Sequence, residues 1–305
     1  MRNRLTRNAF ITLLAASALT GLIPATAHAA PATRDGMAEC DEPYDRRETV
    51  LSVGQRLTPG QKLTSPTQST ELVMQADGNL VLYALGNPGG PRLPLWNSAT
   101  YGNPGAYATM QADGNFVIYR EGGSAQTGGG IWHTDTYGDR TDTNPRAKLD
   151  ADGSFRVIGR RESEFMGLHF WSHNRERSTK VCANDATHEY RYRFNGDWAQ
   201  SASVWMVIQP DNNLVIYRKS DGKAIWNSGT YWAKYYAMEL SIADDGNLRL
   251  RDWFSPYTVA WNAGTGNNPG AYALLQDDGN FVVYKADGGP GKGGALWASG
   301  TYNKV

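Results

Sequence analysis

A nine-residue phrase occurs six times in this chain of 305 residues and constrains its fold more than any other feature. Repetition at a fixed period is the signature of an architecture built from similar units, so the phrase predicts six such units. Two eroded copies read DADGSFRVI (Asp150–Ile158) and ADDGNLRLR (Ala243–Arg251). The four clearest copies are QADGNLVLY (Gln75–Tyr83), QADGNFVIY (Gln111–Tyr119), QPDNNLVIY (Gln209–Tyr217) and QDDGNFVVY (Gln276–Tyr284).

Each copy is predicted to form a β-hairpin. Asp-Gly, or Asp-Asn in the fourth copy, stands between two apolar runs, and these residues tolerate the positive φ of a tight turn. Side chains alternate between the two faces of a strand, so Leu80 and Leu82 of the first copy share one face, which we expect to face the core. The asparagine, valine and tyrosine of the phrase then share the outer face, beside its glutamine and aspartate.

A tryptophan closes each unit. Because tryptophan buries a large apolar area, one repeated in every unit of a β protein is expected in the core. The copies begin at positions 75, 111, 150, 209, 243 and 276, and the longest gap, 59 residues, divides them into three plus three. One small sheet cannot bury its apolar face alone, but three sheets around a common axis can. Two groups of three copies therefore predict two tandem all-β domains. The tryptophans are Trp96, Trp132, Trp171, Trp226, Trp261 and Trp297.

The N-terminus predicts secretion to the extracellular space. Arg2, Arg4 and Arg7 precede an apolar run from Ala9, and Ala27-His28-Ala29 offers a small-residue cleavage site, which together form the pattern of a signal peptide. No later stretch is apolar enough to insert into a membrane. Thirty basic residues balance thirty acidic ones, so charge favours neither nucleic acid nor an anionic membrane as a partner.

These observations divide the chain into five expected parts. Cys40 and Cys182 are its two cysteines, and in an exported protein we expect them to form a disulfide between the leader and the segment that joins the domains. The expected parts are a signal peptide (1–29), an N-terminal leader (30–48), a first domain (49–173), a linker and lead-in (174–200) and a second domain (201–305).

The phrase resembles the signature Q-x-D-x-N-x-V-x-Y of the bulb-type lectins, the monocot mannose-binding family that includes snowdrop agglutinin. Four intact copies, each followed by a tryptophan segment, carry the resemblance over about Leu51–Trp171 and Trp205–Val305. It implies an all-β fold of two tandem type II β-prisms, each made of three repeated antiparallel sheets with pseudo-threefold symmetry. It also implies a secreted, multivalent lectin that recognises mannose or a mannose-like sugar.

The resemblance further implies a ligand role for five positions of each intact copy. Asp77 and Asn79 resemble the groups that bind the 2-hydroxyl of mannose. Gln75 and Tyr83 resemble the partners of the 3- and 4-hydroxyls, and Val81 resembles the apolar contact under the sugar. Together, such carboxylate, amide and phenol groups supply the donors and acceptors that sugar hydroxyls require. The same roles fall on Gln111, Asp113, Asn115, Val117 and Tyr119, on Gln209, Asp211, Asn213, Val215 and Tyr217, and on Gln276, Asp278, Asn280, Val282 and Tyr284.

The eroded copies serve as an internal comparison. Both keep the Asp-Gly turn and lose the glutamine and the tyrosine, and both carry arginine in place of the valine, as Arg156 and Arg249. A fold that tolerates these losses favours a ligand role for the glutamine and tyrosine. We therefore expect the third and fifth copies not to bind mannose as the others do.

No enzyme, cofactor or metal site is predicted. The carboxylates of the phrase lie in turns and have no second carboxylate at a constant offset, as a glycosidase pair would need. His169 and His173 have the i, i+4 spacing of a zinc pair on a helix, but the surrounding text is β-like and offers no third ligand nearby.

Two other functions stay open. Tandem domains of this kind without an enzyme module also resemble lectin-like bacteriocins, which bind surface polysaccharide containing rhamnose or mannose and kill related bacteria. A prism can also bind a protein through its faces. Because the family commonly exchanges C-terminal strands between paired domains, we further hypothesise that Leu296–Val305 completes the first prism, and that the segment after Trp171 completes the second.

Overall fold

The computed structural model describes residues 45–137, 144–158, 169–171, 174–183, 193–231, 238–255 and 258–305. All regular structure in these ranges is β-strand, and none of it is a helix that could cross a membrane. The expected signal peptide, Cys40 and His173 lie outside the described residues. The disulfide from Cys40 to Cys182 therefore stays a prediction.

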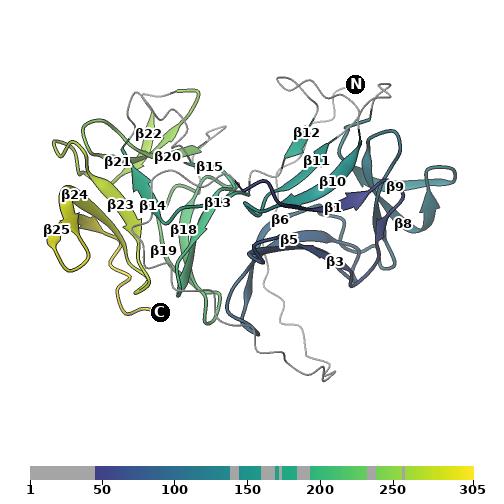
Figure 1. The fold of residues 1–305 in the computed structure, drawn as a ribbon, viewed down its shortest axis with the longest axis horizontal. Helices are drawn as coiled ribbons and strands as arrows, with labels where there is room; N and C mark the ends of the chain where they lie inside the picture. Colours follow the sequence, from purple (N-terminus) through teal and green to yellow (C-terminus); the bar gives the residue numbers. More distant parts are fainter. Residues whose placement is uncertain are drawn as a thin grey trace. The chain divides into compact units, whose positions relative to one another are not determined.

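Three four-stranded antiparallel sheets form the first prism, whose strands run from purple to teal in Figure 1. Each sheet contains the hairpin of one copy, the strand that follows it, and a lead-in strand from before the repeats. The first copy's sheet is β3 (Lys62–Thr64), β4 (Thr70–Met74), β5 (Leu80–Leu85) and β6 (Arg92–Asn97). The second copy's is β2 (Arg56–Leu57), β7 (Tyr107–Met110), β8 (Phe116–Ser124) and β9 (Gly128–His133). The third copy's is β1 (Glu48–Ser52), β10 (Arg146–Asp150), β11 (Phe155–Ile158) and β12 (His169–Trp171).

The second prism repeats this plan, with one additional short strand that pairs in parallel. The fourth copy's sheet is β13 (Glu176–Arg177), β16 (Trp198–Gln200), β17 (Val204–Ile208), β18 (Leu214–Arg218) and β19 (Ala224–Asn227). The fifth copy's is β15 (Arg193–Phe194), β20 (Met238–Ile242), β21 (Leu248–Asp252) and β22 (Val259–Asn262). The sixth copy's is β14 (Lys180–Cys182), β23 (Tyr272–Leu275), β24 (Phe281–Gly289) and β25 (Gly293–Ala298). The predicted all-β fold of tandem prisms is confirmed, and strands from 174–200 belong to the sheets of the second prism.

Lead-in strands join the sheets in the reverse order of the repeats. In the first prism β3 pairs with the first hairpin, β2 with the second and β1 with the third. In the second prism β16, β15 and β14 do the same for the fourth, fifth and sixth hairpins. The earliest of the three lead-in strands, β1 or β14, is thus paired with the last hairpin of its prism.

The Asp-Gly turns have the backbone conformation that the sequence predicts. The turn residue has φ between 75° and 91° in all six copies, including Asn212 in the fourth. Glycine at Gly78 and Gly246 has a second cause, because the loop after the tryptophan lies on the turn. A Cβ at Gly246 would lie 1.9 Å from the carbonyl oxygen of Asn268, and one at Gly78 would lie 2.1 Å from that of Asn103.

Gly246→Ala is expected to lower the free energy of unfolding by about 2–5 kcal/mol, because it adds left-handed strain and a backbone clash. Gly264 is a matched control, since its φ is +67° but nothing lies within 4 Å of its Cβ position. Gly264→Ala should cost only about 1 kcal/mol. Urea denaturation of both variants measures the difference, and equal costs would show that the loop does not pack on the turn as described.

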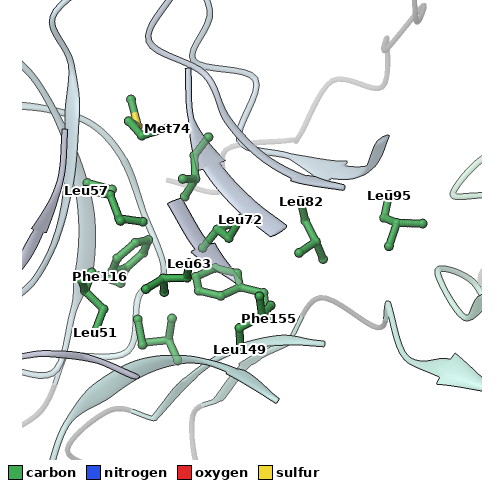
Figure 2. Packing of buried hydrophobic residues seen from close by; sticks show 14 of the residues in the cluster. Leu51, Leu57, Leu63, Leu72, Met74, Leu82, Leu95, Phe116, Leu149 and Phe155 are labelled. Atoms are coloured by element: carbon green, nitrogen blue, oxygen red, sulfur yellow. The ribbon is translucent and has the colours of Figure 1, made fainter. Parts of the chain in front are cut away.

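The core of the first prism is formed by the inward faces of its three sheets, as Figure 2 shows. Leu80 and Leu82 are fully buried there, as their alternation predicts. Phe116 and Phe155 meet edge to face with ring centroids 5.5 Å apart, and Trp96 and Trp132 pack at 5.5 Å in the same manner. These contacts draw on all three copies of the prism.

Three tryptophans close the core of the second prism. Trp226, Trp261 and Trp297 make three pairwise edge-to-face contacts with centroids 5.2–5.8 Å apart. Such contacts between aromatic edges and faces are favourable beyond the area they bury. The expected grouping of tryptophans around a common axis is therefore confirmed for this prism.

The hypothesis of strand exchange is half right: the segment after Trp171 supplies β13 and β14 to sheets of the second prism, but Leu296–Val305 does not complete the first. β25 pairs with β24 of its own prism, and only three residues separate the two strands. After β25 the chain stays on the same prism, where the Thr301 hydroxyl donates to the Gly279 carbonyl and Arg218 donates to that of Lys304. A short hairpin loop closes this local pair at low entropic cost, which favours it over a pairing far along the chain.

The two prisms share a buried contact. Trp198, Trp205 and Val207, from the fourth copy's sheet, belong to the hydrophobic cluster of the first prism. Trp205 is 0% exposed, and its indole N–H donates to the carbonyl of Leu85 at 3.3 Å. A Cβ at Gly86 would lie 2.8 Å from the Trp205 ring, so glycine is needed for this close approach.

Lys219 is buried beside this contact. Its Nζ donates to Gln200 Oε1 and to the Ser201 carbonyl, both at 2.7 Å, and lies 5.7 Å from the centroid of the Trp205 ring. Burial lowers the pKa of Lys219 from 10.5 to about 8, and the charges of Glu176 and Asp277 oppose this shift. The fold thus favours the neutral amine.

The free energy of unfolding is expected to rise by up to about 3 kcal/mol between pH 8 and pH 10. In this window the unfolded chain keeps the Lys219 proton while the folded chain has lost it, so stability increases with pH. Urea denaturation at several pH values measures the slope. Lys219→Met should flatten it, and equal slopes for wild type and variant would count against the shifted pKa.

Candidate functional site

A hydrogen bond joins the glutamine and tyrosine of every intact copy. Gln75 Nε2 donates to the Tyr83 hydroxyl at 2.6 Å across the ends of β4 and β5. The bond recurs between Gln111 and Tyr119 at 2.7 Å, Gln209 and Tyr217 at 2.7 Å, and Gln276 and Tyr284 at 3.0 Å. We name the four places site 1, site 2, site 4 and site 6 after their copies.

The aspartate and asparagine of each site use one oxygen for the fold. In site 1, Asp77 Oδ1 accepts the backbone N–H of Asn79 at 3.0 Å and so shapes the turn. Asn79 Oδ1 accepts the Ser98 hydroxyl and the Thr100 N–H, both at 3.1 Å, which ties the loop after the tryptophan to the hairpin. The same pattern holds at Asp113 and Asn115, at Asp211 and Asn213, and at Asp278 and Asn280.

These internal bonds leave a defined set of groups for a ligand. Among the described residues, Asp77 Oδ2, Asn79 Nδ2 and Gln75 Oε1 have no hydrogen-bond partner, and the Tyr83 hydroxyl accepts one bond and keeps its proton to donate. Val81 is buried but lies outside the core cluster, and strand alternation places it between Asn79 and Tyr83 on the face of the site. The set offers both donors and acceptors to a neutral polyhydroxyl ligand.

Burial raises the pKa of three groups in these sites. It raises the pKa of the Tyr83 and Tyr217 hydroxyls, so both stay protonated and able to donate at neutral pH. Burial also raises the pKa of the Asp211 carboxyl in site 4. Within the described residues, no group of three or more histidine, cysteine, aspartate or glutamate side chains could hold a metal ion.

In the fifth copy, ion pairs occupy the ligand positions. Arg249, in place of the valine, pairs with Asp245 Oδ2, the oxygen that has no partner within the described ranges in the intact sites. Arg251, in place of the tyrosine, pairs with Glu239 at 3.2 Å. The fifth copy therefore satisfies its own polar groups.

The third copy is closed in the same way. Arg156 pairs with both Asp150 and Asp152 at 3.0 Å, and Lys148 pairs with Asp150 at 3.0 Å. Arginine again takes Oδ2 of the turn aspartate. These contacts give a physical reason why we expect the third and fifth copies not to bind a sugar.

One residue beside each site was not found from the sequence. It lies four positions before the glutamine and pairs in register with the site tyrosine, on the same face of the sheet. Its identity varies between copies, so no repeated letter marks it. It is Glu71 opposite Tyr83, Tyr107 opposite Tyr119, Trp205 opposite Tyr217 and Tyr272 opposite Tyr284.

This neighbour makes the four sites unequal. In sites 2 and 6 two tyrosine rings pack 5.7–5.8 Å apart, and a cation, Arg56 or Lys180, lies 4.5 Å from the outer ring. In site 1 Arg92 lies 4.6 Å from the Tyr83 ring and pairs with Glu71.

Site 4 adjoins the contact between the prisms. Its neighbouring residue is the buried Trp205, and Tyr217 packs against the hydrophobic cluster of the first prism. Sites 2 and 6 thus have the most similar residues. In site 4, by contrast, the neighbouring residue Trp205 is part of the contact between the prisms.

Comparisons with known proteins point to sugar-binding proteins. No protein-family model matches the chain. A mannose-specific lectin from Aloe arborescens is 29% identical over 121 residues, which are 39% of this chain and 94% of that lectin. Scilla campanulata agglutinin, described as a fetuin-binding two-domain lectin, is 22% identical, with 82% of this chain and 95% of that chain covered and a TM-score of 0.32. Snowdrop (Galanthus nivalis) agglutinin, solved with methyl-α-D-mannoside, is 26% identical, with 37% and 94% covered and a TM-score of 0.31.

Proposed function

Because this chain belongs to the bulb-type mannose-binding lectin family, in its two-domain form, we propose that it is a multivalent lectin for mannose or a mannose-like sugar. The family is non-enzymatic, so the protein binds its sugar without altering it. The relatives support the sugar class: one is mannose-specific, and snowdrop agglutinin was solved with a mannoside.

One observation carries the proposal. The four copies with a Gln–Tyr hydrogen bond are the four in which Oδ2 of the turn aspartate has no partner among the described residues, and the two copies without it have an arginine on that oxygen. Free polar groups at a surface are costly to leave unpaired once a ligand excludes water, so they discriminate between sugars with and without matching hydroxyls. The sites are thus built for a ligand that pairs with each group.

Secretion and multivalency belong to the same proposal. The N-terminal basic, apolar and small-residue segments favour export, with a mature chain that begins at about Ala30 and a bridge from Cys40 to Cys182. Several weak sites on one chain raise the effective concentration for a second contact, with avidity gains of about 10²–10⁴ where geometry allows. Dense mannose-bearing surfaces are the targets that such a protein suits.

A glycan array with the mature protein tests the proposal. We expect mannose-terminated glycans to be retained and methyl-α-D-mannoside to compete for them. An array with no sugar signal would contradict the proposal and favour binding of a protein through the prism faces. Retention by rhamnose-bearing polysaccharide alone would move the specificity away from mannose.

The tandem arrangement also supports an antibacterial role as the second candidate. Two prisms of this kind in one chain resemble the arrangement of lectin-like bacteriocins. Growth inhibition of related strains by the mature protein, lost when sites 1, 2 and 6 are inactivated, would favour this role. Sugar binding without any inhibition would leave the plain lectin.

A further inference from the structure

An exposed tyrosine accompanies each intact site. It lies five positions after the tryptophan of its copy, in the segments NSATY, TDTY, NSGTY and ASGTY. The eroded copies lack it and have Glu176 and Gly266 at that position. These tyrosines are Tyr101, Tyr137, Tyr231 and Tyr302, and they are 70%, 59%, 61% and 60% exposed.

The preceding threonine fixes the position of this tyrosine. In site 1 the Thr100 hydroxyl donates to the Gly78 carbonyl at 2.7 Å, and its N–H donates to Asn79 Oδ1. The same two bonds hold Thr136, Thr230 and Thr301 in the other sites. The backbone of each tyrosine is therefore anchored to the turn that carries the site aspartate and asparagine.

The fifth copy shows where the tyrosine side chain begins. Thr265 makes the same two bonds there, and a Cβ built on the next residue, Gly266, would lie 3.5 Å from Asp245 Oδ2. In an intact site the equivalent oxygen is the free Oδ2 of the ligand set. An exposed aromatic ring thus starts beside the oxygen that we assign to the sugar.

We propose that Tyr101, Tyr137, Tyr231 and Tyr302 form a second subsite, where each ring stacks on the sugar residue next to the mannose held by the Gln, Asp, Asn and Tyr set. This inference rests on the proposed function and extends it from a monosaccharide to an oligosaccharide ligand. Tyrosine suits the task, because it offers a rigid apolar face with a polar tip and loses little entropy when held. An aromatic residue needed only for folding would be buried, and these four are exposed.

Titration of the mature protein with methyl-α-D-mannoside and with trimannose tests the subsite. The wild type is expected to bind trimannose about tenfold more tightly. Changing all four tyrosines to serine should remove this gain and leave the affinity for methyl-α-D-mannoside within about twofold. Changing them to phenylalanine should keep most of the gain, since stacking needs the ring. Phe254→Ser is the matched control, because Phe254 is 73% exposed but follows β21 of the eroded fifth copy; it should change neither affinity.

The possible failures are distinct. Unchanged trimannose affinity in the serine variant would overturn the inference and leave the proposed function intact. Loss of both affinities with an unchanged melting temperature would place the tyrosines in the primary site and also overturn a separate subsite. A wild type that binds neither sugar would contradict the proposed function itself. If the serine variant melts early, glycine, which the fifth copy carries at Gly266, replaces serine in the same test.

Discussion

Arginine in place of Val81, Val117 and Val282 is expected to reduce binding to immobilised mannan by at least about 100-fold. The arginine should pair with Oδ2 of the turn aspartate, as Arg156 and Arg249 do in the eroded copies, and so remove a ligand group from sites 1, 2 and 6. The loss is large because the surviving site 4 lacks the avidity of linked sites. Equilibrium binding to mannan, with methyl-α-D-mannoside as competitor, measures it.

Methionine at the same three positions is the matched control, because it has a long side chain without charge. We expect the methionine variant to retain most of its binding. Equal losses in both variants would mean that added volume, and not the pairing of Asp Oδ2, closes the sites. Wild-type binding by the arginine variant would remove the aspartate from the ligand set. The fold already accommodates arginine at this position in two copies, so the free energy of unfolding should change little.

Trp205→Ala is expected to lower the free energy of unfolding by about 3–5 kcal/mol, the range for removing a large buried aromatic side chain. Its ring is fully buried against the first prism, and the substitution leaves a cavity and an unpaired Leu85 carbonyl. Urea denaturation followed by circular dichroism gives the change. The variant should also loosen the prism contact and increase proteolysis between the two prisms.

Tyr272→Ala provides the comparison, because Tyr272 occupies the same register position in a sheet away from the prism contact. Its hydroxyl donates to the Gly288 carbonyl at 2.9 Å, and its ring packs on Tyr284. We expect a cost of about 1–2 kcal/mol for these contacts. If both substitutions cost the same, Trp205 does not depend on the neighbouring prism for its burial.

Much of the fold follows from short-range features of the sequence. The Asp-Gly turns and the alternation of Leu80 and Leu82 determine hairpin and core face because φ and side-chain direction are local properties. The exchange of Leu296–Val305 was predicted wrongly because it depends on which of two distant edges β25 meets. The sequences of β24 and β25 do not determine whether β25 pairs locally, across a three-residue loop, or with a distant strand of the first prism.

The candidate site was predicted in its residues but not in its internal bonds. The repeated letters identify Gln75, Asp77 and Tyr83, yet they cannot show that one carboxylate oxygen shapes the turn while the other is free. The cross-strand neighbours were missed because they differ between copies, as Glu71 and Trp205 do. A search by register position, rather than by repeated residue, would have found them.

The nested pairing of the lead-in strands has a consequence for synthesis on the ribosome. β3 meets its partner within a few residues, whereas β1 emerges about a hundred residues before β10, since Glu48 pairs with Asp150. Sheet formation can thus proceed outward from the first hairpin, while β1 waits with unpaired backbone groups until the third repeat has been made. An early strand held open in this way is prone to pair with a neighbouring chain. The order of the strands therefore makes the first prism most exposed to misassembly just before its last sheet closes.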